Sequence, residues 1–528
     1  MRVFTLILLL LVAVQAYKIV IFAPDIANSQ VMFNKRVAQV LADAGHDVTI
    51  AFSVVFDGRD NSDVKIANNI KIYSVNASIG VSKAEADLAQ SKIIFQPLDT
   101  MGGEMREHFT KFMRMLTDSC RSALRNKPFM DWLVKEQFDI AFAHPYHMCP
   151  IGLIHHAQIP TWIWLQSGHL MDHVSRSVGV PLIPSFVPPV MLDLMDEMTF
   201  MERAKSLFIT IMAKNFYPKM VSNRETQMFR EEVDPNFPDL MELAKECPLV
   251  LVNSNEFYEL PRPTLAKVVN IGGIGAEKKD TKPLPEQFEK IANNGKGIIL
   301  VSFGSVAPSA LIPDSWKTAL IGAFTRLPDY QFVVRYEGKD LQNKIPSNVH
   351  LTKWMPQSDL LQHPKTKAFL THGGYNSLQE AINAGKPLVT IGLFGDQPKN
   401  EKIAKKHGFA VNLSKANFTA EAVYDALTEV LENPRYLSSA QRLSAMVAKR
   451  PVSPEQLLVK WTEFVAEFKT LENLVPAGTK LNFVQYHSLD VIAVILTLVS
   501  VVLYILLKLL VCTARCVCCK KTRKEKMQ

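Results

Sequence analysis

The chain has 528 residues, of which 48% are hydrophobic and 21% are charged. This length exceeds one ordinary domain of about 100–200 residues, and the composition excludes a largely disordered chain. The formal net charge of +8 is concentrated after residue 507, where seven Lys or Arg stand against one Glu, so the rest of the chain is nearly neutral. No basic nucleic-acid-binding surface is predicted, and no nucleic-acid partner is expected.

The first sixteen residues have the pattern of a secretory signal peptide. Arg2 gives a positive start, and 6–14 is an apolar run too short to cross a bilayer. Val14 and Ala16 supply small residues at the spacing that signal peptidase requires. A buried first strand is the alternative, but 18–23 already supplies that strand. We therefore expect a signal peptide over 1–16.

The following chain alternates between short apolar runs and helical patterns. In its first part we expect a helix over 34–44, ended by Gly45, and strands over 18–23, 47–52, 138–143, 249–253 and 267–271. In its second part we expect strands over 297–305, 331–336, 349–351, 368–371, 387–391 and 410–413. This alternation predicts an α/β fold with two Rossmann-like, doubly wound domains.

The predicted domains cover 17–280 and 281–487. The charged, Pro-containing stretch 275–297 is the expected linker, and a helix after Pro454 is expected to pack back on the first domain. A Met- and Phe-rich segment contains an apolar helix over 191–212. An acceptor pocket, a bilayer contact and ordinary core all fit that helix.

The C-terminal end predicts a membrane anchor. A transmembrane helix over 488–511 is followed by a basic tail over 512–528, which the positive-inside rule places in the cytosol. Lys524 and Lys526 resemble the dibasic retrieval signals of endoplasmic reticulum membrane proteins, although a simple anchor explains the same charges. We expect a single-pass type I protein of the endoplasmic reticulum membrane with a luminal globular part.

Cysteines and glycosylation tripeptides fit this topology. The predicted luminal cysteines Cys120, Cys149 and Cys247 allow at most one disulfide. The tail cysteines are placed for palmitoylation, and free thiols fit equally well. A glycoprotein is expected, with candidate acceptor sites at Asn76, Asn412 and Asn417.

The segment 354–397 carries the chemistry. The strand over 368–371 runs into His372-Gly373-Gly374, and a helix then begins near Asn376 and ends before Gly385. Glycines let a backbone approach a phosphate, and a helix start presents free N–H groups and a positive dipole end. The pattern is neither a Walker loop nor GxGxxG.

Single residues of this segment also have structural interpretations. Ser377 and Glu380 have the spacing of a capping box, and Gly385 fits a helix end. His372 could be a loop histidine whose hydrogen bonds are made within the protein. The joint occurrence with Trp354 and the pair Asp396-Gln397 favours a binding site.

This segment resembles the signature of the UDP-glycosyltransferase family, in particular the animal UDP-glucuronosyltransferases. The resemblance covers nearly the whole chain and includes 251–256, 271–274, 301–305 and 486–490. It implies two Rossmann-like domains of the GT-B type facing a cleft, with the acceptor in the first domain and the nucleotide sugar in the second. The family does not require a metal, and a homo-oligomer is compatible with it.

The implied activity is that of an enzyme of class EC 2.4.1. It transfers glucuronate or glucose, with inversion, from a UDP-sugar to a hydroxyl or similar nucleophile of a small lipophilic acceptor, as in detoxification. No cofactor is expected besides the co-substrate, UDP-glucuronate or UDP-glucose. Asp396 and Gln397 could serve either sugar, so the donor and the acceptor stay open.

By motif position, the resemblance also implies roles for individual residues. An indole face suits a flat base and a carboxylate can accept two hydroxyl donors. The implied contacts are Trp354 and Gln357 for the nucleoside, Ser305, His372, Gly374, Asn376 and Ser377 for the diphosphate, Glu380 for the ribose, and Asp396 and Gln397 for the sugar.

The catalytic pair of the family is altered in this chain. In the family a histidine after the first strand acts as the base, assisted by a carboxylate at the end of a later strand. Gln30 occupies the place expected for the histidine, and His144 occupies that of the acid. Glutamine cannot accept a proton at a useful pH.

Three interpretations follow. His144 is itself the base, with Gln30 orienting the acceptor. Alternatively, Asp25, His147 or another group is the base, or none is needed for an acidic acceptor such as a phenol. In the third, the chain is a non-catalytic membrane protein that binds a UDP-sugar or a lipophile.

Overall fold

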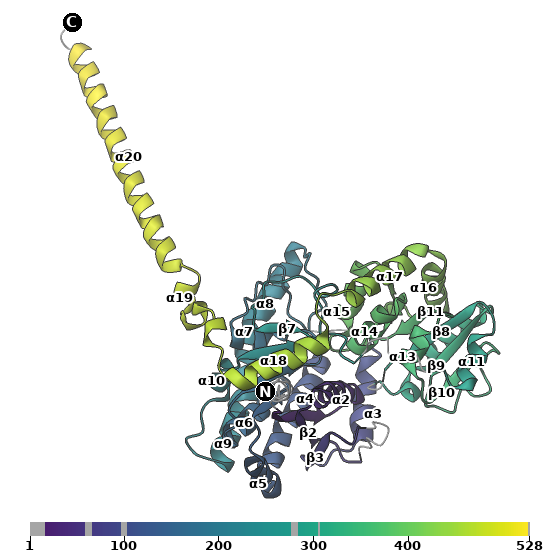
Figure 1. Cartoon of the computed structure of the whole chain (residues 1–528). Coiled ribbons are helices and arrows are strands. Elements are labelled where there is room, and N and C mark those ends of the chain that lie inside the picture. Colours follow the sequence, from purple (N-terminus) through teal and green to yellow (C-terminus); the bar gives the residue numbers. More distant parts are fainter. Residues whose placement is uncertain (1–15, 59–65, 97–102, 276–282, 305–306, 526–528) are drawn as a thin grey trace, which may run out of the picture. The chain divides into compact units, whose positions relative to one another are not determined.

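The computed structural model describes residues 16–58, 66–96, 103–275, 283–304 and 307–525. Two parallel sheets with their helices lie in one compact unit, Met1–Leu474, and Val475–Gln528 forms a second unit (Figure 1). The predicted α/β fold with two parallel sheets is therefore confirmed. The predicted signal peptide falls almost wholly outside the described residues, and the domain boundaries stay predictions.

The first sheet has seven parallel strands in the order β3-β2-β1-β4-β5-β6-β7. The chain moves outward from β1 to β3 and then starts again beside β1, so the order reverses between β1 and β4. Ligands of such sheets bind at the carboxyl ends of the strands at this reversal. The strands are β1 (Lys18–Asp25), β2 (Asp47–Val54), β3 (Lys71–Asn76), β4 (Ile140–Ala143), β5 (Trp162–Gln166), β6 (Leu249–Val252) and β7 (Val268–Asn270).

The second sheet repeats this plan with six parallel strands in the order β10-β9-β8-β11-β12-β13. Its reversal lies between β8 and β11, so each half has one reversal of strand order. The strands are β8 (Gly297–Ser302), β9 (Tyr330–Arg335), β10 (Val349–Thr352), β11 (Thr366–Thr371), β12 (Leu388–Thr390) and β13 (Ala410–Asn412).

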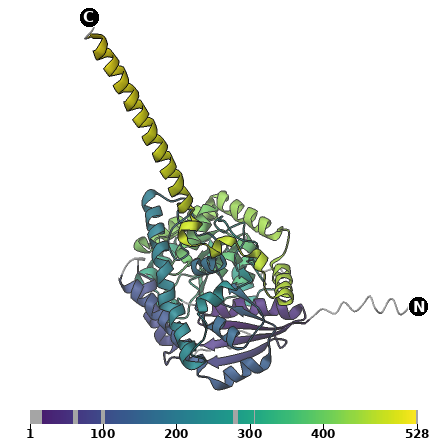
Figure 2. The ribbon, with the colours of Figure 1, turned by 90° about the vertical axis from the view of Figure 1, so that its left-hand side faces the viewer.

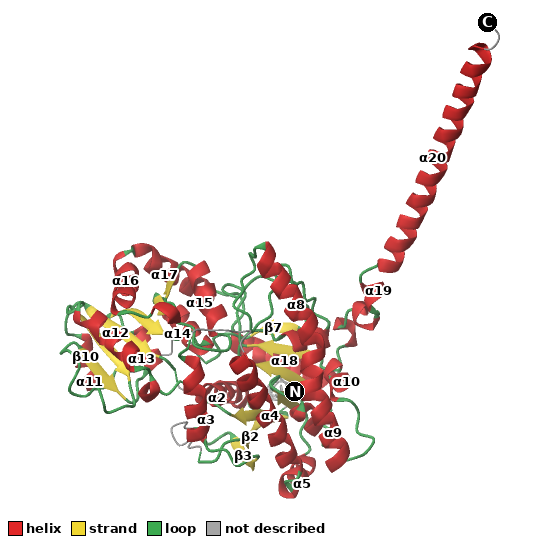
Figure 3. Cartoon of the chain, turned by 180° about the vertical axis from the view of Figure 1, so that it is seen from behind, coloured by secondary structure: helices red, strands yellow, loops and turns green. Residues whose placement is uncertain are grey.

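Buried apolar clusters lie on both faces of each sheet, and Figure 3 shows the yellow strands among red helices. Along β1, Ile19 and Ile21 enter one cluster of buried side chains, while Val20 and Phe22 enter another. Side chains of a strand point alternately to its two faces, so a continuous apolar run is what a doubly covered strand requires.

Helices follow most strands of both halves, and Figure 2 shows the purple strands of the first sheet with helices packed outside them. The first half contains α2 (Asn28–Asp43), α3 (Lys83–Ile94), α4 (Gly103–Leu124), α5 (Lys127–Glu136), α6 (Cys149–His156), α7 (Asp172–Val178), α8 (Phe200–Tyr217), α9 (Asn223–Glu232) and α10 (Leu240–Lys245). The second half contains α11 (Glu286–Ala292), α12 (Asp314–Thr325), α13 (Gln357–Gln362), α14 (Tyr375–Ala384), α15 (Gln397–Lys406), α16 (Ala420–Glu432) and α17 (Pro434–Ala448).

The helix α18 (Pro454–Phe468) packs on the first sheet. Leu458 and Val465 belong to the buried cluster that covers β1 and β2, and the Thr161 hydroxyl donates to the Lys469 carbonyl at 2.7 Å. α18 also lies against α2. The chain after the second sheet thus contributes to the core of the first.

The structure differs from the sequence predictions in several places. Helix α2 begins at Asn28 rather than at 34, because a first helical turn accepts polar residues; Gln30 therefore lies in a helix and not in a loop. The central strand β5 and the edge strand β3 were not predicted. Residues 276–282 of the predicted linker lie outside the described residues, and α11 occupies its last part.

The predicted apolar helix over 191–212 is in fact α8, which begins nine residues later. Its one buried side chain is Ser206. Seven large apolar side chains are exposed along it, so the interpretation as ordinary core is wrong for this helix. They are Phe200, Met201, Leu207, Phe208, Ile211, Met212 and Phe216.

The second unit contains α19 (Phe483–Tyr486) and α20 (Leu489–Glu525). Within α20, Leu489–Cys516 is long and apolar enough to cross a membrane, and among the described residues it is the one such helix. This segment contains the predicted span over 488–511 except for its first residue.

Candidate active site

The glycine loop after β11 packs around a histidine. A Cβ built on Gly374 would lie 2.6 Å from His372 Nε2, and one on Gly304 would lie 2.5 Å from the same atom. Only glycine fits at either position, and Gly304 also has a positive φ of +78°. Burial, helped by Arg335, lowers the pKa of His372 to about 4, so the ring is neutral at pH 7. Ser305, the neighbour of Gly304, lies outside the described residues.

Helix α14 begins at this loop. Gly374 is its N-cap, so Ser377 lies inside the first turn and does not cap the helix. The capping-box interpretation of Ser377 and Glu380 is therefore wrong, because the helix starts earlier than the sequence suggested. Gly385 ends the helix with φ +62°, as predicted. The first turn thus leaves its N–H groups free of any side-chain cap at the carboxyl edge of the sheet.

Gln357, at the start of α13, links two residues of α14. Its Nε2 donates to Glu380 Oε2 at 2.8 Å and to Ser377 Oγ at 3.2 Å. The other oxygen of Glu380 pairs with Arg36 of α2 at 3.2 Å. Trp354, three residues before Gln357, is 64% exposed. The exposed Trp354 ring therefore lies shortly before a group of polar side chains that are hydrogen-bonded to one another.

Asp396 and Gln397 start α15 with different surroundings. The Asn400 amide donates to Asp396 Oδ2 at 3.0 Å. Oε1 of Gln397 accepts from the backbone N–H groups of Leu393 at 2.9 Å and Phe394 at 3.2 Å. The side-chain oxygen of Gln397 is therefore already bonded to the backbone of its own loop. Its Nε2 is the group left for another contact.

A hydrogen-bonded network that the sequence did not reveal connects the two halves here. Asn400 Nδ2 also donates to the Gly373 carbonyl at 2.9 Å, so its Oδ1 faces His169 Nε2 at 2.6 Å. His169 Nδ1 is bonded to Glu259. Burial alone would raise the pKa of Glu259, but His169, Lys399 and the Leu260 N–H group together lower it to about 2. Because Asn400 Oδ1 can only accept, Nε2 of His169 is the donor in this contact.

His144 lies directly after β4 at the reversal of the first sheet. Its Nε2 is 2.7 Å from Asn34 Oδ1 of α2. Nδ1 is buried and has no hydrogen-bond partner among the described residues. Burial, and then the neighbouring His147, lower its pKa to about 3, so the imidazole is neutral.

Gln30 lies one helical turn before Asn34. Its Oε1 is buried and, within the described chain, has no partner, while its side chain interacts with the Tyr146 hydroxyl. That hydroxyl is also bonded to Ser167, and the Tyr146 ring stacks beside His144 at 5.9 Å between centroids. Gln30 and His144, the predicted catalytic residues, thus lie in one buried polar group.

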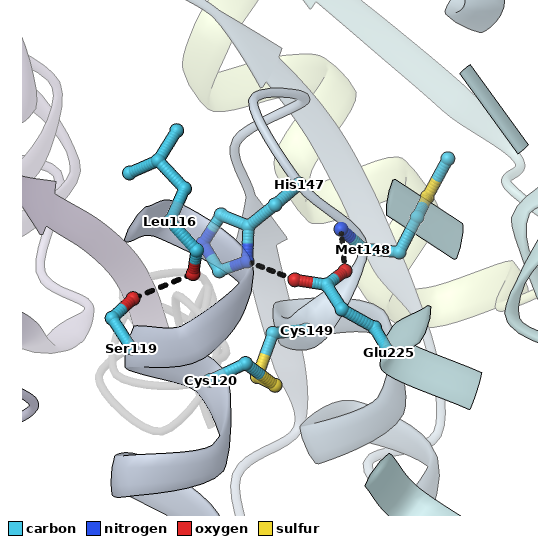
Figure 4. Close-up of a disulfide and its surroundings, with 7 residues drawn as sticks. All are labelled: Leu116, Ser119, Cys120, His147, Met148, Cys149 and Glu225. Carbon is cyan, nitrogen blue, oxygen red and sulfur yellow. Dashed lines mark hydrogen bonds and ion pairs between the residues drawn. A yellow bond between two sulfur atoms is a disulfide. The ribbon is translucent and has the colours of Figure 1, made fainter. Parts of the chain in front are cut away.

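The other histidine of this loop has a structural environment. His147 Nδ1 is 2.9 Å from Glu225 Oε1, and Met148 N donates to Glu225 Oε2 at 2.6 Å. Figure 4 shows the carboxylate of Glu225 between these two groups, beside the disulfide that joins Cys120 of α4 to Cys149 of α6. Glu225 and the disulfide hold the loop in place, and Cys247 is free and buried.

The two halves also touch at the start of α14. Asn376 Nδ2 is 3.4 Å from the Ser29 carbonyl of α2, and the Ser254 hydroxyl is 2.7 Å from the Tyr375 hydroxyl. A Cβ on Gly168 would lie 3.8 Å from Asp396 Oδ2. The predicted donor residues therefore lie next to the carboxyl edge of the first sheet, where His144 and Gln30 are found.

Comparison with known proteins defines the class. The family model described as UDP-glucoronosyl and UDP-glucosyl transferase matches residues 18–524. UDP-glucuronosyltransferase 2B9 of Macaca fascicularis is 31% identical over 501 residues, covering 93% of this chain and 92% of that protein. The putative UDP-glucuronosyltransferase ugt-50 of Caenorhabditis elegans is 29% identical over 514 residues, with 93% and 94% covered.

Solved structures show the same architecture. A Phytolacca americana UGT2, solved with UDP-2fluoro-glucose and pterostilbene, has a TM-score of 0.55 at 14% identity and covers 86% of this chain and all of that one. The glycosyltransferase SnogD of Streptomyces nogalater has a TM-score of 0.55 at 16% identity, with 85% and 100% covered. The fold is that of GT-B glycosyltransferases.

The chain thus belongs to the UDP-glucuronosyl and UDP-glucosyl transferase family. It is a UDP-glycosyltransferase, an enzyme that takes a sugar from a UDP-sugar.

Proposed function

We propose that this protein transfers glucuronate or glucose from its UDP-sugar to a hydroxyl or similar nucleophile of a small lipophilic acceptor, by direct displacement with inversion. The observation that carries the proposal is the position of the donor residues. They lie along one edge of the second sheet at its reversal, where doubly wound sheets bind nucleotides. The altered catalytic pair lies at the matching edge of the first sheet.

The diphosphate is assigned to the start of α14. Uncapped N–H groups and the positive end of the helix dipole attract phosphate oxygens, and no metal is then required to stabilise the leaving UDP. Gly374 lets the backbone approach, while Asn376 and Ser377 add side-chain donors. His372 is neutral and donates through one ring nitrogen. Ser305 completes the set by its place in the sequence.

The nucleoside is assigned to Trp354, Gln357 and Glu380. The exposed indole of Trp354 offers a face on which uracil can stack. Glu380 accepts two hydroxyl donors of a ribose once Arg36 and Gln357 yield its oxygens. Gln357 is close enough to Glu380 to serve the same nucleoside.

The transferred sugar is assigned to Asp396 and Gln397. Asp396 accepts from sugar hydroxyls, and Gln397 donates through Nε2, since its Oε1 is already bonded to the backbone. Neither residue separates glucose from glucuronate. The acceptor is assigned to the first half, with His144 as the base and Gln30 as the residue that orients the acceptor.

We place the protein in the endoplasmic reticulum membrane, held by Leu489–Cys516, with the globular part in the lumen. A luminal location agrees with the disulfide Cys120–Cys149, because disulfides persist in oxidising compartments. Asn76 and Asn417 are exposed and suit glycan attachment. Asn412 is only half exposed and is less suitable.

The test begins with purified full-length protein in detergent. Calorimetry should detect UDP binding that Asp396→Asn or Asn376→Ala weakens and that Asn293→Ala, on an exposed helix end, leaves unchanged. UDP release is then measured with UDP-glucuronate and UDP-glucose against phenols and aliphatic alcohols. No affinity for UDP or any UDP-sugar would contradict the donor site. Binding without turnover on any acceptor would instead support a non-catalytic binding protein.

His144→Ala tests the base separately. A positioned general base contributes about 10²–10⁴-fold, so transfer at saturating donor should fall by at least about 10²-fold while UDP affinity is kept. An unchanged rate with both phenols and aliphatic alcohols would remove His144 from the mechanism and leave the donor site intact.

A further inference from the structure

Gln30, Asn34 and His144 form a hydrogen-bonded chain. Only one placement of the hydrogen atoms is consistent with its contacts. Asn34 is fully buried in α2. Its Nδ2 donates to the backbone carbonyl oxygen of Gln30 at 2.9 Å. A carbonyl can only accept, so the amide nitrogen of Asn34 must face Gln30. Its Oδ1 therefore faces His144 Nε2 at 2.7 Å.

This orientation determines the tautomer of His144. Oδ1 of an amide has no proton to give, so Nε2 of His144 must carry the hydrogen. Burial keeps the ring neutral, and a neutral imidazole carries one proton. Nδ1 is consequently a bare lone pair.

This lone pair and the side-chain oxygen of Gln30 both lack a hydrogen-bond donor among the described residues. His144 Nδ1 and Gln30 Oε1 are both buried acceptors that receive no hydrogen bond from the described chain. Buried polar atoms are rarely left unpaired, and an unpaired acceptor at a binding position indicates a missing donor. Both residues lie where the order of the first sheet reverses, between β1 and β4. A ligand hydroxyl is the simplest donor that satisfies such a site.

We propose that Asn34 is a positioning residue that fixes His144 in the Nε2–H tautomer, so that Nδ1 takes the proton of the acceptor and acidic acceptors of the phenol class are preferred. This proposal rests on the proposed transfer of a sugar from a UDP-sugar. In the step, the acceptor O–H bond breaks and its proton moves to Nδ1 while the oxygen bonds to the anomeric carbon. The bond from that carbon to the β-phosphate oxygen breaks, and its electron pair leaves with UDP.

The preference for phenols follows from the partner of Nε2. The resulting imidazolium keeps its Nε2–H bond to Asn34, but a neutral amide offers no negative charge to stabilise it. Such a histidine is a weak base, and a weak base serves best for an acceptor that loses its proton easily. A phenol, with a pKa of about 10 as in tyrosine, fits far better than an aliphatic alcohol, which like water has a much higher pKa.

The decisive variant is Asn34→Asp, which places a carboxylate on Nε2 without changing the side-chain shape. It should strengthen His144 as a base, because a carboxylate stabilises the imidazolium. We expect the ratio of transfer to an aliphatic alcohol over transfer to a phenol to rise at least about tenfold, one pKa unit of base strength being a tenfold change. The acidic limb of the pH profile of kcat/KM should move to higher pH. Gln39→Glu adds the same charge on the outer side of α2 and should change neither.

A second measurement uses the wild-type protein and does not depend on whether Asn34→Asp folds. Nitrogen-15 NMR of histidine-labelled full-length protein in nanodiscs should report His144, assigned by its loss in His144→Gln, with a protonated Nε2 and a bare Nδ1. Asn34→Leu should mix the two tautomers and reduce phenol transfer while UDP affinity, measured by calorimetry, is unchanged. A protonated Nδ1 in the wild-type protein would overturn the proposal.

The outcomes separate the role of Asn34 from the proposed function. A wild-type protein that transfers sugar, with an acceptor ratio and pH profile that Asn34→Asp leaves unaltered, would overturn the role of Asn34 alone. A wild-type protein that binds no UDP-sugar would overturn the proposed function itself.

Discussion

His169 of the first half donates a hydrogen bond from Nε2 to Oδ1 of Asn400 in the second half, over 2.6 Å. Asn400 in turn bonds the Gly373 carbonyl and the Asp396 carboxylate. The orientation of the carboxylate assigned to the donor sugar therefore depends on a residue of the first half. This contact couples the two halves at the position where transfer is proposed to take place.

Asn400→Ala should raise the KM for the UDP-sugar and lower kcat/KM roughly 10- to 100-fold. The variant removes hydrogen bonds to a carboxylate and a buried carbonyl, and one bond to a charged group contributes about 1.5–3 kcal/mol. His169→Phe should have a smaller effect in the same direction, because Asn400 keeps its other bonds. His350→Phe, on the edge strand β10, is the control. Steady-state kinetics with varied donor measures all three, and an unchanged donor KM in both site variants would refute the coupling.

Trp354→Ala should weaken UDP binding without destabilising the fold. Stacking of a base on an aromatic ring contributes about 1–3 kcal/mol, so the Kd should rise by roughly 5- to 150-fold. The side chain is 64% exposed and contributes little to the core. Phe483→Ala is a matched control, since Phe483 is also 64% exposed but lies in the second unit. Equal UDP affinity in the two variants, by calorimetry, would remove Trp354 from the site.

Gly304→Ala should lower the Tm more than Gly395→Ala. Both glycines have positive φ, +78° and +63°, so both variants carry a backbone strain of about 1–2 kcal/mol. The added Cβ meets the His372 ring at 2.5 Å in the first variant and nothing within 4 Å in the second. The overpacking in Gly304→Ala costs a further ~1–3 kcal/mol.

The double variant Gly304→Ala/His372→Ala removes the ring that the new methyl group meets. It should recover most of the difference in Tm between the two glycine variants. Thermal denaturation in detergent measures the set. Identical Tm values for the Gly304 and Gly395 variants would show that the ring does not confine this position.

The protein should lose stability as the pH falls from 7 towards 4. Burial lowers the pKa of His144 and His173 to about 3 and that of His372 to about 4. Unfolded histidine titrates near 6.5, so below that pH the unfolded chain binds protons that the folded chain refuses. The stabilisation is complete above pH 6.5 and is lost progressively towards the folded-state values.

At pH 5 each of these histidines costs about 2 kcal/mol of unfolding free energy relative to pH 8. His173→Phe should therefore reduce the loss between pH 8 and pH 5 by about this amount. His173 stacks on Tyr217 and lies outside the assigned catalytic and donor residues. Denaturant unfolding at the two pH values measures the difference, and an equal loss in both proteins would contradict a neutral buried His173.

The sequence predicted the parallel strands well where an apolar run was bounded by turn residues, as at Lys18–Asp25 and Gly297–Ser302. It predicted the glycine loop for the same local reason. It could not predict His169 with Asn400 or Asn34 with His144, because 231 and 110 residues separate the partners and no periodicity connects them. Strand β5 was missed although Trp162–Gln166 is wholly buried. Its tryptophans and isoleucine favour a strand, so the sequence did carry a signal for β5.

The exposed apolar stripe on α8 has a practical consequence for anyone who prepares this enzyme. A chain shortened at Leu474 to avoid the last helix will still present phenylalanine, methionine and isoleucine side chains to water over several helical turns. Such a fragment should aggregate or adsorb to surfaces unless a mild detergent covers this helix or serine replaces its exposed apolar residues. Deleting α20 alone will therefore not make the globular part fully soluble.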